Sequence, residues 1–443
     1  MARSTLHITL AMGLALVLAG CETPDWLGEK EAPPLPGERI SVLRLERALE
    51  PDPAISDLQV RLPRPWVNRD WPQSGGTANH AMHHLETGEQ LGLAWSAGVG
   101  EGSSDNVRLL ATPVIAEGVA YVLDSLTRLH AISLERRRAI WSLNLRRRGE
   151  ESGAIGGGVA YDSGAVFVTT GYGQVIALEA EGGGLLWRRD LTAPLRAAPT
   201  VSGGRVFAVT FDNRLYALSA ETGEILWDHT GIPEDAGLIG AAAPAVDGGS
   251  VVVAFSSGEL MALRVENGRV IWSDQLVRGG RMTALGALSD IRGAPVIDRG
   301  VAYAISHSGR MGAIDLRSGR RLWERDIASD QMPWVAGDFI FVLTTQGEML
   351  CLSRQDGRVR WVTPLPRFGD ARARKDPIYW SGPVLVSDRL LALSSDGRAA
   401  AVSPYSGELM GMVGLPDPVL LPPVVADGAV FVLTDNAELL ALR

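Results

Sequence analysis

Cysteine is nearly absent from this chain of 443 residues, which contains only Cys21 and Cys351. Two cysteines cannot build a disulfide framework, and if Cys21 carries a modification, no disulfide can form within the monomer. Positive charge is also in deficit, because 42 basic and 51 acidic residues give a formal net charge of −9. This balance argues against nucleic acid as a general partner, since nucleic-acid binding needs a dominant basic surface.

Aromatic residues and long apolar runs are the other shortages. Aromatic residues make up 6% of the chain, whereas 51 glycines and 25 prolines make it rich in turns and poor in long helical patterns. The apolar stretch at residues 8–18 is too short to span a bilayer. It has the length of a secretory signal core instead.

What the chain does contain is a repeated segment that ends in tryptophan. The repeated tryptophans are Trp95, Trp141, Trp187, Trp227, Trp272, Trp323 and Trp361. Successive tryptophans are 38 to 51 residues apart. A period of this size with short β-type runs is typical of propellers and solenoids.

Each repeat contains four apolar runs separated by turn residues. In the clearest copy, residues 198–227, the runs are separated by Ser-Gly-Gly, Asp-Asn and Glu-Thr-Gly. Glycine and Asx residues supply the backbone conformations that tight antiparallel turns require. The sequence therefore predicts an all-β fold, with each repeat forming one four-stranded antiparallel blade of a β-propeller. Cys351 aligns with an alanine of this pattern and is predicted to be a small buried residue.

The two ends of the repeat array are complementary. Residues 93–100 resemble a last strand with its Trp95, and residues 422–443 supply three strands and stop before a fourth. Together they predict an eighth blade with strands from both termini, which closes the ring and removes exposed sheet edges. In the seventh repeat Gly411 occupies the tryptophan position, so we expect that blade to be the least firmly held.

The first 65 residues are predicted to lie outside the fold. Residues 1–20 have the pattern of a lipoprotein signal peptide, and Leu-Ala-Gly-Cys at residues 18–21 looks like a bacterial lipobox with Cys21 as the lipidated residue. Acyl chains on Cys21 would hold the protein on a membrane. Glu22, rather than aspartate, follows the anchor and favours the outer membrane. Residues 21–65 read as a proline-rich tether, and residues 66–443 as the propeller.

The repeats with their Thr-Gly-x-x-x-Trp ending resemble the pyrroloquinoline-quinone type of propeller repeat. Within that superfamily, the lipobox, the blade count and the stretches at 288–304 and 314–323 are similar to the BamB family of outer-membrane protein assembly factors. The resemblance implies a lipid-anchored scaffold at the periplasmic face of the outer membrane. It also implies BamA, the barrel-forming subunit, as partner, unfolded outer-membrane proteins as further clients, and no cofactor or catalytic residue.

The same resemblance places the BamA contact on two inter-blade loops, residues 229–242 and 276–293. Leu238 matches a family leucine, and Asp290, after Ser289, matches a family aspartate. Ile239 stands where the family has arginine, and Arg292 stands where it has a second aspartate. The implied partner-binding residues are Leu238, Ile239, Ser289, Asp290 and Arg292.

Two other functions remain open at this stage. Quinoprotein dehydrogenases share the repeat, but they add a vicinal cysteine pair and a Ca²⁺ site with clustered oxygen ligands, and this chain has no cysteine pair. A generic ligand-binding propeller is the other alternative. His80, His83 and His84 form the densest group of potential metal ligands, and we interpret them as part of a solvated or packed loop, with zinc or copper as the alternative.

Overall fold

The structure is a computed structural model that describes residues 49–151, 153–234, 238–277 and 290–443. The signal peptide, Cys21, the first part of the tether and Ser289 lie outside these residues. Those described belong to one compact unit, Leu49–Arg443. It contains a short 3₁₀ helix, η2 (Pro53–Ile55), and is otherwise built from strands.

Eight four-stranded antiparallel sheets form a closed propeller, which confirms the predicted fold class. Blades 1 to 4 are β2–β5 (Val114–Ala116, Val119–Leu123, Arg128–Ser133, Arg138–Asn144), β6–β9 (Gly157–Asp162, Ala165–Thr170, Gln174–Glu179, Leu185–Asp190), β10–β13 (Thr200–Ser202, Arg205–Thr210, Arg214–Ser219, Ile225–Thr230) and β14–β17 (Ala245–Asp247, Ser250–Ala254, Glu259–Arg264, Val270–Gln275).

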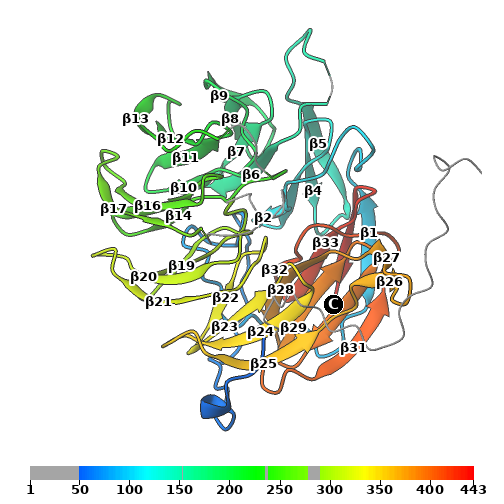
Figure 1. Ribbon diagram of the computed structural model, residues 1–443. Coiled ribbons are helices and arrows are strands. Elements are labelled where there is room, and N and C mark those ends of the chain that lie inside the picture. The colour runs from blue at the N-terminus through cyan, green and yellow to red at the C-terminus, as the bar shows by residue number, and fades with distance from the viewer. Residues whose placement is uncertain (1–48, 152, 235–237, 278–289) are drawn as a thin grey trace, which may run out of the picture. The chain divides into compact units, whose positions relative to one another are not determined.

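Blades 5 to 7 are β18–β21 (Val296–Asp298, Val301–Ile305, Met311–Asp315, Arg321–Arg325), β22–β25 (Trp334–Ala336, Phe339–Leu343, Glu348–Ser353, Val359–Pro364) and β28–β31 (Trp380–Val386, Arg389–Ser394, Arg398–Val402, Leu409–Gly414). A two-stranded hairpin, β26 (Phe368–Asp370) and β27 (Lys375–Pro377), lies between blades 6 and 7 in the chain. The first strand of each blade lies toward the middle of the ring and the last toward its rim (Figure 1).

Blade 8 closes the ring with strands from both ends of the array. It consists of β32 (Val424–Ala426), β33 (Ala429–Leu433), β34 (Glu438–Leu442) and β1 (Leu93–Gly98), and β1 pairs antiparallel with β34. The predicted closure is therefore confirmed. Pairing of a strand from before the first repeat with the last strand of the chain leaves no blade incomplete.

Tryptophans hold neighbouring blades together. Trp187 of blade 2 donates from Nε1 to the carbonyl of Ala220 in blade 3, 2.9 Å away. Its ring lies over Gly223, whose φ is +68° and where a Cβ would lie 2.5 Å from Cε3 of the indole. The glycine of the Thr-Gly-x-x-x-Trp pattern is thus required both by the backbone and by the neighbouring ring.

The same contact recurs at six of the eight blade boundaries. The other donors and acceptors are Trp141 to Ala180, Trp227 to Val265, Trp272 to Leu316, Trp323 to Arg354, and Trp361 to Pro404. Trp95 instead packs edge-on against Phe431 of its own blade. Within the blades, Trp227 lies opposite Ala217, and Trp361 lies opposite the buried Cys351.

Gly411 lies opposite Ala401, at the register position that tryptophan occupies in the other blades. In blade 8 the third and fourth strands come from different segments, so the turn on which such a tryptophan would dock is replaced by Arg443 and Gly92, which exchange backbone hydrogen bonds. A Cβ added to Gly411 would meet nothing within 4 Å. The tryptophan is therefore missing where its docking turn is missing.

Residues 66–87, which we call the axial segment, run along the innermost strands of all eight blades. In blade order, starting with blade 8, the contacts to the inner strands are made by Asn68, Trp71, Pro72, Gln73, Ala78, Asn79, His83 and Leu85. Trp71 and Ile115, for example, exchange backbone hydrogen bonds of 2.7 and 2.9 Å. One segment thus makes a full circuit of the channel and closes it on that side.

The histidines of this segment are packed. His80 is 2% exposed and its Nδ1 lies 2.7 Å from the carbonyl oxygen of Pro295. His84 is bound between Pro63 and the backbone N–H of Asp388, and His83 faces Asp298. His80 and His83 therefore contact the two ends of β18 in blade 5, and His84 contacts Pro63 and blade 7.

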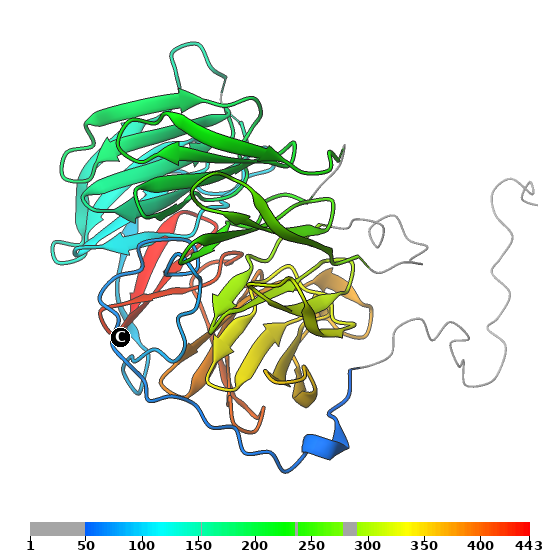
Figure 2. The same cartoon turned by 90° about the vertical axis from the view of Figure 1, so that its left-hand side faces the viewer.

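The end of the predicted tether lies against the propeller. The N–H of Asp52 donates to Val359 O at 2.8 Å, Arg360 donates to Leu58 O, and Val60 is buried. Figure 2 shows the chain after η2 running along one side of the ring. From Leu49 onward this segment is therefore attached to the fold.

Replacing Trp187 by alanine should destabilise the propeller by about 3 to 5 kcal/mol, because the change removes an indole that is 9% exposed together with its inter-blade hydrogen bond. The midpoint of urea-induced unfolding measures this. Leu185 lies in the same strand and is 59% exposed, so Leu185→Ala is the matched control and should shift the midpoint little. Equal shifts for both variants would contradict the docking role.

Acidification should weaken the axial segment through His80. Burial lowers the pKa of His80 from 6.5 to about 4. The contribution of neutral His80 to the free energy of unfolding is therefore fully present above pH 6.5 and is lost as the pH falls toward 4. The full difference between the pKa of His80 in the unfolded and folded protein corresponds to about 3 kcal/mol of stability. In His80→Asn the amide can donate in place of Nδ1 and tolerates the positive φ of 63°.

Urea unfolding at pH 7 and pH 4 tests this expectation. The native protein should lose more stability than His80→Asn between the two pH values. Parallel losses would show that His80 is not the titrating group.

Candidate binding face at the mouth of the axial channel

The two loops identified from the sequence begin on the face opposite the axial segment. Each follows the last strand of a blade and is joined to the turn between the second and third strands, as in the bonds from Gly231 N to Asn213 O and from Leu276 N to Gly258 O. The axial segment forms its hydrogen bonds near the last residues of the first strands, at the end of each strand away from the loops. The axial segment and the two loops therefore lie on opposite sides of the channel.

A buried carboxylate joins the two loops. Asp290 is 4% exposed, and its Oδ2 accepts a 2.8 Å hydrogen bond from the N–H of Leu238. The carbonyl of Asp290 also accepts from the N–H of His307. Burial raises the pKa of Asp290, and the Leu238 hydrogen bond opposes that rise. Asp290 thus fixes the position of Leu238, and little of its own surface is available to a partner.

The exposed part of the predicted site is apolar and cationic. Ile239 is 51% exposed, while Leu238 and Arg292 are half-buried. Arg292 lies so close to Gly240 that a Cβ there would be 3.1 Å from its Nε. The cation of the second loop therefore sits beside the first loop. The structure brings together four of the five predicted residues, and their contact with a partner stays a prediction.

Arg196 is a further member of this site that the sequence did not reveal. Its Nη1 donates to Leu238 O at 3.4 Å, and its guanidinium lies 3.9 Å from the ring centre of Phe211. Burial lowers the pKa of Arg196, an effect that Asp290 opposes. An isolated arginine in an inter-blade loop has no sequence signature. Three tryptophans do not fit the repeat, namely Trp71, Trp334 and Trp380. They could have indicated the residues around the channel, because all three are buried there.

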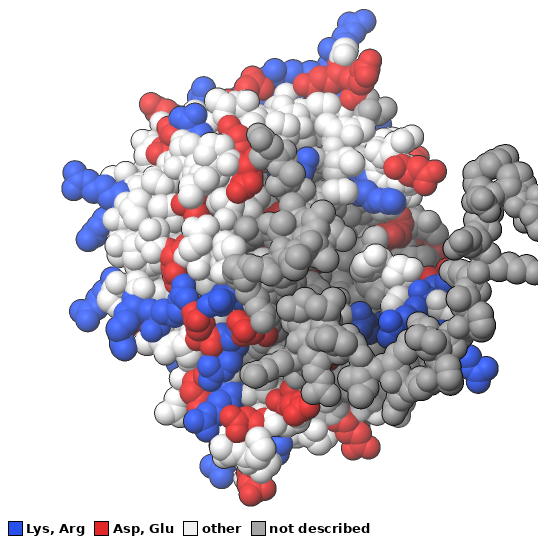
Figure 3. Space-filling view, viewed as in Figure 1, with Lys and Arg blue, Asp and Glu red and all other residues white. Residues whose placement is uncertain are grey.

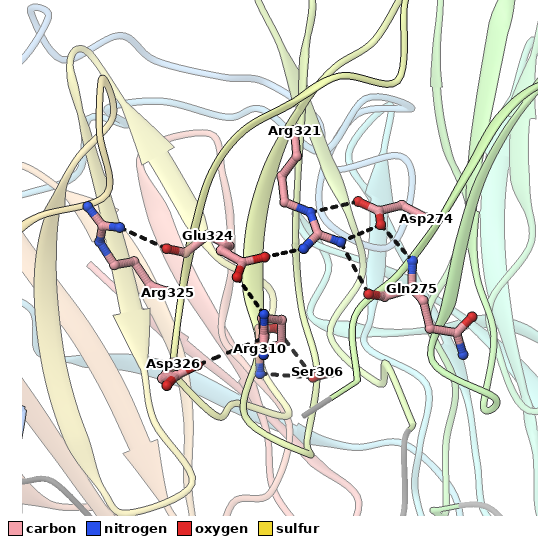
Figure 4. Close-up of polar contacts among 8 residues, drawn as sticks. All are labelled: Asp274, Gln275, Ser306, Arg310, Arg321, Glu324, Arg325 and Asp326. Carbon is pink, nitrogen blue, oxygen red and sulfur yellow. Dashed lines mark hydrogen bonds and ion pairs between the residues drawn. The ribbon is translucent and has the colours of Figure 1, made fainter. Parts of the chain in front are cut away.

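An ionic network anchors the start of the second loop (Figure 4). Arg321 of β21 reaches back to blade 4, where it binds the carboxylate of Asp274 and the carbonyl of Gln275. Glu324 accepts from both Arg321 and Arg310, the latter at 2.6 Å. The last residues of β17 are thereby fixed to blade 5, so the loop leaves from a rigid base.

Charge on the described surface is mixed. Basic and acidic side chains are interspersed around the face in Figure 3. In the described ranges, no group of three or more His, Cys, Asp or Glu residues is arranged to hold a metal ion. The geometry thus presents side chains for recognition, with no assembled set of ligands for a metal.

Comparison with known proteins identifies the family. The family model described as "Outer membrane protein assembly factor BamB" matches residues 128–363, more than half of the chain. The chain belongs to the BamB family. The BamB of Salmonella typhimurium is 28% identical over 354 residues, which cover 79% of this chain and 88% of that protein. Membership of the BamB family supports a role in outer-membrane protein assembly.

Solved structures resemble the chain in fold. BamB from Moraxella catarrhalis superposes with a TM-score of 0.68 at 18% identity, covering 80% of this chain and all of that one. A quinohemoprotein alcohol dehydrogenase from Comamonas testosteroni gives a TM-score of 0.65 at 16% identity, covering 84% of this chain and 80% of the enzyme. At these identities, the likenesses to BamB and to the enzyme both show the fold alone.

Removing the Asp290 carboxylate should loosen the first loop. In Asp290→Ala the N–H of Leu238 loses its acceptor, which costs about 1 to 3 kcal/mol for a buried donor. Amide hydrogen exchange at Leu238 should therefore accelerate by about tenfold or more. Asp290→Asn keeps an acceptor oxygen and should exchange like the native protein. Unchanged exchange in Asp290→Ala would refute the joining role.

Proposed function

We propose that this protein is a lipid-anchored scaffold of the outer-membrane protein assembly machinery, bound to the periplasmic domains of a BamA-type barrel subunit through the face that carries Leu238, Ile239 and Arg292. The observation that carries the proposal is the family match together with the joined loops at the channel mouth. Loops on a closed propeller are suited to binding, and the described residues of these two loops are held together by the contacts of Leu238 with Asp290 and of Gly240 with Arg292.

The composition of this face fits a protein partner. The exposed Ile239 and the half-buried Leu238 offer apolar area, and Arg292 adds a charge that can set the register of the complex. The mixed surface charge gives no preference for nucleic acid. Unfolded outer-membrane proteins are further candidate clients.

Anchoring and location follow from the amino-terminal region. Cys21 in its lipobox is the proposed site of acylation, and Glu22 favours the outer membrane over the inner one. Among the described residues, no helix has the length and apolarity needed to cross a membrane. The tether would connect the lipid to the propeller, which its described residues contact from Leu49 onward.

No specific observation favours a dehydrogenase. The resemblance to alcohol dehydrogenases is one of fold, and the two cysteines at positions 21 and 351 cannot form a vicinal pair. We therefore propose a scaffold without catalytic residues or a bound cofactor.

Affinity purification from detergent-solubilised membranes tests the proposal. The native protein should recover the barrel subunit, and Ile239→Asp or Leu238→Asp should reduce recovery about tenfold, because a charge would be buried in an apolar contact. Cys21→Ala should move the protein from the membrane fraction to the soluble fraction.

The matched control is Ile232→Asp. Ile232 lies on the same inter-blade connection, before Leu238 in the chain, and is also 51% exposed. It does not line the cavity or trough at the channel mouth. Its substitution should leave recovery unchanged. Equal recovery with all three variants would place the interface elsewhere, and no recovery with the native protein would refute the partner.

A further inference from the structure

A small cavity lies on the propeller axis, between the axial segment and the loop face. Its volume is about 150 Å³, and all eight blades contribute to its wall near the starts of their first strands. The wall combines small apolar residues, such as Ala111, Ala197 and Ala243, with polar and charged ones, and Trp71 forms part of it from the axial segment. A cavity of about this volume can hold a benzene-sized group, so one large apolar side chain fits against its apolar part.

Aromatic side chains make up one end of this cavity. Trp71 and Trp334 lie with ring centres 6.4 Å apart and an interplanar angle of 15°. The Nε1 of Trp71 has no hydrogen-bond partner among the described residues. The stacked pair gives a rigid apolar wall against which another ring can pack.

Two guanidinium groups line the same cavity. Arg196 and Arg292 both contact the segment Leu238–Gly240, from its two ends. Neither takes part in an ion pair in the described part of the chain. The neighbouring carboxylates are already bound, since Asp330 pairs with His307 at 2.7 Å and Asp290 accepts from Leu238. The Asp290 carboxylate interacts electrostatically with both guanidinium groups without contacting either one directly. The site therefore offers two guanidinium groups that no described carboxylate contacts directly.

A larger trough of about 490 Å³ adjoins the cavity on the loop face. It shares Arg292, Asp330 and Gln331 with the cavity and continues past Ile239 to Tyr379. Tyr379 is 65% exposed, and Ile378 and Trp380 beside it are buried. The trough can hold several residues of an extended chain, with the cavity at its end.

We propose that the axial cavity binds the carboxyl-terminal residue of an extended polypeptide. The apolar side chain of that residue enters the cavity against Trp71 and Trp334, and its α-carboxylate binds Arg196 and Arg292. The preceding residues lie in the trough. An apolar pocket beside unpaired guanidinium groups fits this ligand because a chain terminus joins an apolar side chain and a carboxylate at one carbon atom. The inference goes beyond the proposed scaffold function, since it requires no contact with the barrel subunit.

Fluorescence anisotropy with the full chain in detergent tests the inference. The probe is a labelled octapeptide of alternating polar and apolar residues that ends in phenylalanine with a free carboxylate. Amidation of that carboxylate should weaken binding about tenfold or more, because it removes charge-assisted hydrogen bonds. Replacing the terminal phenylalanine by glycine should weaken binding by a similar factor, because the cavity then stays unfilled.

Variants of the protein locate the site. Arg292→Gln should weaken binding of the free acid about tenfold and leave binding of the amide nearly unchanged. Ala241→Leu, which adds volume to the cavity wall, should affect the phenylalanine peptide more than the glycine peptide. Arg269→Gln, at an exposed arginine in the turn before β17, is the matched control and should change neither.

Binding of acid and amide within twofold of each other would overturn the proposal, as would equal effects of Arg292→Gln and Arg269→Gln. Arg196 also donates a hydrogen bond to Leu238 O, so Arg196→Gln can act on the loop as well as on the peptide. Arg292→Gln is therefore the decisive variant, and Arg196→Gln is a second test. Thermal unfolding of each variant confirms that the propeller is intact. Recovery of the barrel subunit is measured separately, so either proposal can fail without the other.

Discussion

The contact between a tryptophan of one blade and a glycine of the next is the interaction on which this propeller depends. A four-stranded blade cannot bury both of its faces alone, so its strands are stable only when the neighbouring blade covers them. The glycine permits both the positive φ of the turn and the approach of the indole ring, and the indole N–H binds a carbonyl of that same turn. Each copy of the pattern thus specifies a blade and its junction with the next.

The axial segment determines which part of the ring can serve as a binding surface. Its backbone and side chains bond to the inner strands of all eight blades, so it occupies one end of the channel, away from the two loops. The joined loops lie toward the other end, where Gly240 and Arg292 line the same cavity as the stacked Trp71 and Trp334. The difference between the two ends of the channel therefore arises from a single stretch of chain next to the tether.

The fold could be predicted in detail because each repeat of the sequence carries the strand and turn pattern of one blade. The period of the tryptophans, the turn residues and the complementary ends gave the blade architecture and the shared eighth blade, and the position of Cys351 followed from the repeat. The site could be predicted less well. The loops carrying Leu238 and Asp290 were identified, but the burial of Asp290 depends on the approach of two loops from different blades, and Arg196 belongs to a third connection.

By itself the sequence determined the number of blades, their strand order and the way the ring closes, because these features rest on local periodicity and on turn chemistry that each repeat carries. Only the tertiary structure decided the course of residues 66–87, the burial of His80 and the meeting of Arg196, Leu238, Asp290 and Arg292. These contacts join residues that are distant in the chain and follow no period. They form only when the closed ring brings its inner strands and loops together around one axis.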